Sequence, residues 1–204
     1  MSLRKTIVGQ FRKPHGFLGR LAGWTMANRP SNIDRNLWTV ELLDVQPSDN
    51  VVEIGCGPGL ALEACLLKAT QGSVLGLDHS QTMLDQARNR NAAGCENGRL
   101  TLKLATLDEA ALPAGKFDKI CSANVVQFFP DQVKSFRKMF AALKSSGLSA
   151  TTYMPRNKNA SREDALKMAE EVAGNMKLAG FTKIRIEELP MNPVPALCVL
   201  GERP

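Results

Sequence analysis

One segment of the chain, residues 51–78, constrains the possible folds more than any other. An apolar run at residues 51–54 leads into a loop at positions 55–59 that contains three glycines. A helical pattern follows over residues 60–69, and a second short apolar run at 73–78 ends in an aspartate. A strand, a glycine loop, a helix and a strand in this order are typical of a βαβ unit, in which both strands are parallel. The segment therefore predicts an α/β fold.

The rest of the chain continues the alternation of strands and helices. Further strands are expected at residues 99–104, 116–123, 148–154, 181–188 and 196–201, and further helices after a cap at Ser31, from Ser80 to about Asn91, at 131–143 and at 161–179. Helices between most strands indicate a mostly parallel sheet covered on both faces. The last two strands have no helix between them and should form an antiparallel hairpin at one edge. The prediction is a Rossmann-like, seven-stranded α/β domain.

The composition is that of one ordinary globular domain. The chain has 204 residues, of which 44% are apolar and 23% charged. No apolar run approaches the roughly 18 residues of a membrane span, and no signal-peptide core follows the N-terminus. Five cysteines form no Cys-x-x-Cys pair and only two histidines are present, so no metal site is expected. Scattered cysteines favour reduced core thiols in a cytoplasmic protein.

The net charge of +6 lies entirely in residues 1–35. This segment holds seven basic residues and one acid, whereas residues 36–204 hold 19 of each sign. We expect a basic N-terminal arm over residues 1–35 and a catalytic domain over 36–204. The arm has three possible partners, an anionic substrate, a membrane surface or nucleic acid, or it is a solvated amphipathic segment. Few aromatic residues interleave with its charges, which makes nucleic acid unlikely.

The loop after the first strand carries the clearest chemical signal. Glycines permit a tight turn and let a ligand approach the backbone. A dinucleotide site needs its third glycine one position later, where this chain has Leu60, and Glu53 would repel a pyrophosphate. S-adenosylmethionine has an ammonium and a sulfonium group but no phosphate, so it is compatible with Glu53. Asp78, at the end of the second strand, is placed to accept hydrogen bonds from a ribose diol.

These residues resemble those of class I S-adenosylmethionine-dependent methyltransferases. The family motif E-x-G-x-G-x-G is matched in full from Glu53 to Gly59, and its second acid by Asp78. A later motif, G-D-x-x-x-L-P, is matched in part, because Leu107 replaces the glycine before Asp108. The resemblance covers roughly residues 36–204. It implies that the cofactor S-adenosylmethionine contacts Glu53, Gly55, Cys56, Gly57, Gly59, Asp78, His79, Met83, Leu107, Asp108 and Asn124.

The resemblance also implies in-line transfer of a methyl group to a nucleophilic atom. In that family the acid at Asp108 faces the adenine amino group, and the position of Asn124 lines the methionine end of the cofactor. A small organic acceptor is favoured because no large substrate domain is present. Methylation of nucleic-acid bases is not supported, since residues 122–125 lack an N-P-P-Y-like turn. No catalytic residue stands out.

Several alternatives stay open from the sequence. Phe128, Phe129 and Tyr153 belong either to the wall of a substrate cavity or to the core. Asp118 is expected to be a structural acid. A non-catalytic protein that binds S-adenosylmethionine remains an alternative function, and an NAD-dependent oxidoreductase a weaker one.

Overall fold

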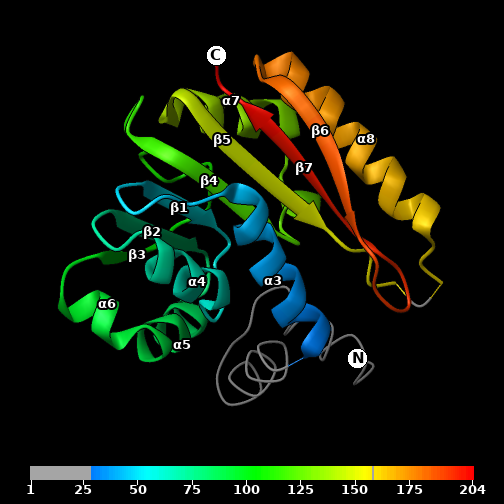
Figure 1. Cartoon of the computed structure of the whole chain (residues 1–204). Helices are drawn as coiled ribbons and strands as arrows, with labels where there is room; N and C mark the ends of the chain where they lie inside the picture. The colour runs from blue at the N-terminus through cyan, green and yellow to red at the C-terminus, as the bar shows by residue number, and fades with distance from the viewer. Residues whose placement is uncertain (1–28, 158) are drawn as a thin grey trace.

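A seven-stranded sheet forms the centre of the molecule. The computed structural model describes residues 29–157 and 159–204 (Figure 1). Most of the expected basic arm, residues 1–28, lies outside the described residues. The strands are β1 (Asn50–Ile54), β2 (Ser73–Asp78), β3 (Leu100–Leu104), β4 (Phe117–Ala123), β5 (Leu143–Tyr153), β6 (Thr182–Leu189) and β7 (Ala196–Glu202). Their order in the sheet is β3-β2-β1-β4-β5-β7-β6.

The sheet is parallel except at its C-terminal edge. Five adjacent strands, in the order β3, β2, β1, β4 and β5, pair in parallel with one another. Strand β7 lies antiparallel between β5 and β6. The hairpin of β6 and β7 and the parallel arrangement of the other strands confirm the fold expected from the sequence. All parallel strands end at the same edge of the sheet, where open α/β folds bind ligands.

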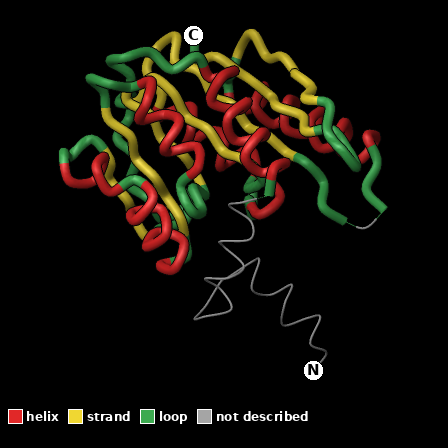
Figure 2. Tube along the Cα trace, turned by 60° about the horizontal axis from the view of Figure 1, so that its bottom comes forward, coloured by secondary structure: helices red, strands yellow, loops and turns green. Residues whose placement is uncertain are grey.

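Helices cover both faces of the sheet. They are α3 (Pro30–Leu43), α4 (Leu60–Lys68), α5 (Gln81–Arg90), α6 (Ala92–Glu96), α7 (Gln132–Ala142) and α8 (Arg162–Ala179), with a 3₁₀ turn η1 (Val126–Phe128). Helices α3 and α4 pack together on one face, and α7 and α8 on the other (Figures 1 and 2). Successive residues of β1 serve both layers: Val51 belongs to the core beneath α3 and α4, and Val52 to the core beneath α7 and α8.

Two local predictions were wrong, and one short helix was missed. Helix α3 begins at Pro30, with Arg29 as its N-cap, and no side chain caps it, so Ser31 is not the cap. This helix runs through positions 35 and 36, where the boundary between arm and domain was expected. Strand β5 begins at Leu143 instead of residue 148, because Leu143 pairs with Phe117 before an irregular stretch. The short helix α6 was not predicted; its Gly94 packs against Leu66 of α4.

The C-terminal helix follows its sequence signals closely. Ser161 and Asp164 form a capping box at the start of α8, and Gly180 ends the helix in a left-handed conformation. Among the described residues, no helix is long and apolar enough to cross a membrane.

Candidate functional site

The glycine loop between β1 and α4 is held in a conformation that depends on its glycines. Gly55, Gly57 and Gly59 all have positive φ angles, of 66°, 51° and 82°, which side chains rarely tolerate. A Cβ on Gly55 would lie 2.5 Å from Cγ2 of Val125. A Cβ on Gly59 would lie 2.6 Å from Nδ2 of Asn91. Gly57 differs, because a Cβ there would meet no atom within 4 Å. The loop is therefore packed at both ends and leaves open space at its centre.

Asp78 fastens this loop to the end of β2. Its Oδ2 accepts a hydrogen bond from the amide of Gly57 at 2.8 Å, and its Oδ1 accepts one from the amide of Ser80 at 2.9 Å. Burial raises the pKa of the Asp78 carboxyl, although these two amides and the nearby His79 act against the rise. Nδ1 of His79 lies 3.6 Å from Oδ1. A carboxylate here both fixes the loop and presents negative charge beside it.

Glu53 is a buried acid with an unpartnered oxygen. It precedes the loop in β1, is 2% exposed, and its Oε2 has no hydrogen-bond partner. Burial, and secondly the charge of Asp78, raise the pKa of Glu53 from 4.5 to about 8. An unpartnered buried carboxylate costs free energy unless a ligand supplies a donor or a positive charge.

These acidic acceptor groups suit a cationic ligand better than a phosphate. Two acids, Glu53 and Asp78, flank the loop, and the Gly57 amide already donates to Asp78. In a dinucleotide site the loop amides are free to bind pyrophosphate. The open space over Gly57 gives a ligand access to the backbone.

The other residues predicted for the cofactor occupy varied positions. Cys56 is 4% exposed and lies in the core beneath α4, and burial raises the pKa of its thiol. Its amide donates to the Leu77 carbonyl and its carbonyl accepts from the Gly59 amide, so its backbone holds the loop together. Met83 and Leu107 are also buried, at 3% and 5% exposure. His79 and Asp108 are exposed, and the Asp108 carbonyl accepts a hydrogen bond from Lys138.

Asn124 lies directly after β4 and joins this strand to the end of β5. It has a left-handed φ of 57°, and its side-chain amide makes two hydrogen bonds with the backbone of Met154, at 2.8 and 3.0 Å. Nε2 of Gln127 donates to the Asn124 carbonyl at 2.8 Å. The Asn124 amide is therefore committed to the protein backbone.

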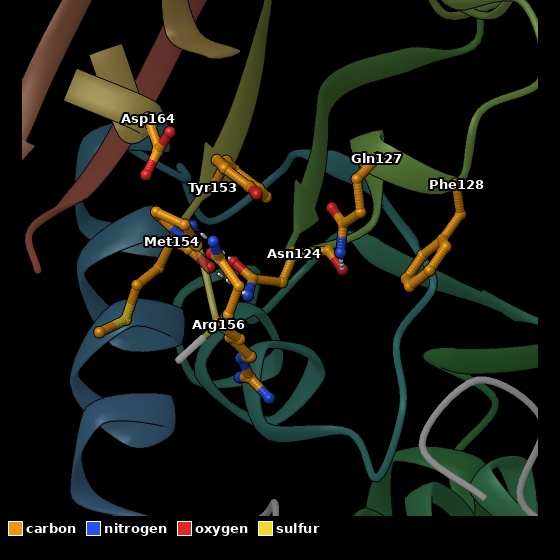
Figure 3. Close-up of a pocket in the computed structure, with 9 residues that line it drawn as sticks. Asn124, Gln127, Phe128, Tyr153, Met154, Arg156 and Asp164 are labelled. Carbon is orange, nitrogen blue, oxygen red and sulfur yellow. Dashed lines mark hydrogen bonds between the residues drawn. The ribbon is translucent and has the colours of Figure 1, made fainter. Parts of the chain in front are cut away.

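A cavity of about 500 Å³ opens beside Asn124 (Figure 3). Its described lining residues come from η1, from the segment after β5 and from α8, and they are Asn124, Gln127, Phe128, Tyr153, Met154, Pro155, Arg156, Asn157 and Asp164. Phe128 and Tyr153 thus lie in the wall, whereas Phe129 packs edge-on against Phe136 of the core. Because Val125 contacts Gly55, the cavity adjoins the glycine loop.

Several cavity residues were missed from the sequence. Met154, Arg156 and Asp164 belong to no motif and meet only in the fold. One available signal was position, since residues 154–157 follow a parallel strand at the edge that binds ligands. Asp118 lies at the opposite edge. It accepts hydrogen bonds from the Asn50 amide and from Lys144, which confirms its structural role.

The fold and the glycine loop define a class of nucleotide-cofactor enzyme, and comparisons with known proteins identify it. Residues 51–147 match the model of a methyltransferase domain. The "Uncharacterized methyltransferase YdaC" of Bacillus subtilis is 29% identical over 90% of this chain and 98% of its own length. Trans-aconitate 2-methyltransferase of Rhizobium rhizogenes is 31% identical over 76% of this chain. The match spans only 56% of that enzyme's own length.

Solved structures share the fold at low sequence identity. A SAM-dependent methyltransferase from Aquifex aeolicus has a TM-score of 0.69 and 16% sequence identity. The match covers 89% of this chain and 98% of the Aquifex chain. Phosphoethanolamine N-methyltransferase 2 of Haemonchus contortus, solved in complex with S-adenosyl-L-methionine, has a TM-score of 0.67 and 16% sequence identity. The match covers 84% of this chain and 52% of the Haemonchus chain. The chain is a methyltransferase that resembles the class I S-adenosylmethionine-dependent enzymes in sequence and in fold. It is an enzyme that uses S-adenosylmethionine as its methyl donor.

Proposed function

We propose that this methyltransferase acts on a small-molecule acceptor held in the cavity beside Asn124. One observation carries the proposal: the glycine loop and the segment after β4 touch where Gly55 meets Val125. A cofactor over the loop and an acceptor in the cavity would then share a boundary. A volume of about 500 Å³ suits a small organic molecule.

We assign the cofactor to the carboxyl ends of β1 and β2. Gly57 supplies the open space for close approach, and Asp78 retains lone pairs for ribose hydroxyls. Glu53 would face the positively charged methionine end of the cofactor, because a cation there favours the ionised form of its carboxyl and gives the unpartnered oxygen a partner. Asp108 is exposed and free to meet the adenine. The buried Cys56, Met83 and Leu107 would shape the site from beneath.

The chemistry needs little beyond alignment of the two molecules. S-adenosylmethionine supplies a methyl group on a sulfonium, which is already an activated leaving group. Tyr153 is a poor base, because burial and Asp164 raise the pKa of its hydroxyl. Asp164 is itself occupied in the cap of α8. The chain's residues therefore act by orienting the acceptor and excluding water, which contributes on the order of 7–11 kcal/mol in well-aligned reactions.

The relatives favour a small acceptor without naming it. Trans-aconitate is small, but another relative, 28% identical, is an 18S rRNA (guanine(1575)-N(7))-methyltransferase of Saccharomyces cerevisiae. This chain spans 52% of the length of the rRNA enzyme. We favour the small acceptor because a hollow of about 500 Å³ suits a small organic molecule, and the fractionation below tests RNA as the alternative acceptor.

The basic N-terminal segment has a separate place in the proposal. Of the expected arm, residues 1–35, we assign the part before α3 to the acceptor side, as a lid or an anion-attracting surface. Residues from the start of α3 onward, including 36–204, we assign to the methyltransferase domain. Contact of the segment with a membrane surface and a cytoplasmic location remain parts of this proposal.

The experiment is to incubate the protein with methyl-labelled S-adenosylmethionine and a cell extract. The extract is afterwards separated into metabolite, protein and RNA fractions. We expect label in the metabolite fraction, and none when Gly57→Val replaces the wild type. Label confined to the protein or RNA fraction would overturn the small-molecule acceptor.

A further inference from the structure

Arg35 of α3 is a buried arginine without an acidic partner. Its side chain is 1% exposed and its Nε has no hydrogen-bond partner. The remaining nitrogens donate to neutral groups, the carbonyl of Ser31 and the side-chain oxygen of Asn32, and one lies 3.7 Å from the sulfur of Met154. Within residues 29–157 and 159–204, no carboxylate forms an ion pair with Arg35. A hydrophobic side chain would cost less here.

A second guanidinium, from the segment after β5, reaches the same amide oxygen. Nη2 of Arg156 donates to Oδ1 of Asn32 at 3.4 Å. Burial and the charge of Arg156 lower the pKa of Arg35 to about 9. Desolvation and the charge of Arg29 lower the pKa of Arg156 in turn. Arg35 and Arg156 therefore repel each other around one neutral oxygen, and Arg29 adds to the repulsion at Arg156. In the described part of the chain none of the three has an ion-pair partner.

This cluster lies at one end of the cavity. Met154 and Arg156 line the wall, and in Figure 3 Arg156 and Asp164 lie at opposite ends with Tyr153 between them. Asp164 is the one acid among the described lining residues, and its Oδ2 accepts hydrogen bonds from the amide and hydroxyl of Ser161. The cavity thus has a positive end that no described acid neutralises.

We propose that the Arg156 end of the cavity binds an oxyanion of the acceptor, a carboxylate or a phosphate group. Arg156 contacts the oxyanion through its planar guanidinium, which matches either group. Asn32 orients that guanidinium, and Arg35 adds positive charge from behind as a positioning residue. This inference rests on the proposed function and narrows the acceptor to an acidic small molecule.

Calorimetric titration tests the contact directly, without turnover. Citrate serves as the carboxylate probe and glycerol 3-phosphate as the phosphate probe, at constant ionic strength with S-adenosylhomocysteine present. At least one probe should bind the wild type, and Arg156→Gln should weaken it by about 10- to 150-fold. The matched control Arg137→Gln, an exposed arginine of α7, should change it by less than about twofold. The probe that binds with the lower dissociation constant shows whether the site prefers a carboxylate or a phosphate group.

Two results would overturn the proposal. One is that neither probe binds the wild type, and the other is that Arg156→Gln binds as well as the wild type. The titrations are repeated without S-adenosylhomocysteine. Failure to bind S-adenosylhomocysteine would contradict the proposed function, whereas the oxyanion titrations without it still test the oxyanion site.

A second variant separates positioning from a structural role for Arg35. In Arg35→Met the buried charge is replaced by an apolar side chain of similar length. We expect an unchanged or higher melting temperature together with weaker oxyanion binding. A lower melting temperature with intact oxyanion binding would show that Arg35 serves the fold and would remove it from the site.

Discussion

The two halves of the proposed site each contain a buried ionisable side chain with an unpartnered polar atom, an acid in one half and a base in the other. At the ends of β1 and β2, Glu53 is a buried acid with an unpartnered oxygen. Near the ends of β4 and β5, Arg35 is a buried base with an unpartnered nitrogen. At the opposite edge of the sheet, Asp118 is paired with Lys144 at 2.7 Å. Because unpartnered buried polar groups destabilise a fold, the contrast indicates that the first two serve ligands, a cation and an anion.

The largest effect is expected from closing the space over the glycine loop. Gly57→Val should weaken S-adenosylmethionine binding roughly 100-fold or more, because the new side chain occupies the ligand's approach to the backbone. Gly115→Val is the matched control, since Gly115 also has a positive φ, of 60°, and open space at its Cβ. Both variants bear a backbone strain of about 1–2 kcal/mol.

Calorimetry and thermal melting on the two glycine variants decide this prediction. We expect similar melting temperatures for both and loss of cofactor binding for Gly57→Val alone. Equal cofactor affinities in the two would show that the cofactor does not lie over this loop.

The next effect is expected at Asp78. Asp78→Ala removes an acceptor that the ribose hydroxyls and two backbone amides share, so cofactor affinity should fall by about 10- to 150-fold. The free energy of unfolding should also fall, because the amides of Gly57 and Ser80 lose their partner. Asp85→Ala, an exposed acid of α5, is the control for charge alone. An unchanged dissociation constant for Asp78→Ala would move the ribose elsewhere.

The raised pKa of the buried Glu53 carboxyl predicts a pH dependence of stability. Between its ordinary pKa of 4.5 and its folded pKa of about 8, only the folded chain holds the proton. Unfolding then releases a proton, so stability falls as the pH rises, by roughly 1.4 kcal/mol per pH unit from this group. Urea unfolding from about pH 5 to about pH 8 should show a shallower fall for Glu53→Gln than for the wild type. If the free energy of unfolding changed equally with pH in both proteins, the pKa of Glu53 would not be raised in the folded chain.

The smallest effect is expected at the paired acid of the opposite edge. Burial acts to raise the pKa of Asp118, but Lys144 and the Asn50 amide hold it below 3.8. Its contribution is therefore present above that value and lost as the pH falls through the lower folded pKa. Asp118→Asn should lower the free energy of unfolding by about 0.2–1 kcal/mol at neutral pH, with cofactor affinity unchanged. A change in cofactor affinity in Asp118→Asn would contradict the purely structural role of this edge of the sheet.

The cofactor half could be predicted from the sequence because it is local. The run from Glu53 to Gly59 is contiguous, and a positive φ at each glycine restricts those positions to that residue. Asp78 follows from the length of one βαβ unit. The strand and helix pattern was equally local, down to the capping box of α8.

The acceptor half could not be predicted because its parts are distant in sequence. Arg35 and Arg156 meet only through Asn32, after α3 packs against β5. The early start of β5 was missed for a related reason. Residues 144–147 have a turn-like composition, with Ser146 at a φ of 63°, yet the pairing of Leu143 with Phe117 places them within the strand.

The most direct test that the two halves of the site bind ligands of opposite charge is to titrate two ligands into each of two variants. S-adenosylmethionine and the preferred oxyanion probe are each titrated into Glu53→Gln and Arg156→Gln. We predict that Glu53→Gln loses affinity for the cofactor and keeps it for the oxyanion, and that Arg156→Gln shows the reverse. If both substitutions weaken both ligands equally, or neither substitution weakens either ligand, the two halves do not bind ligands of opposite charge.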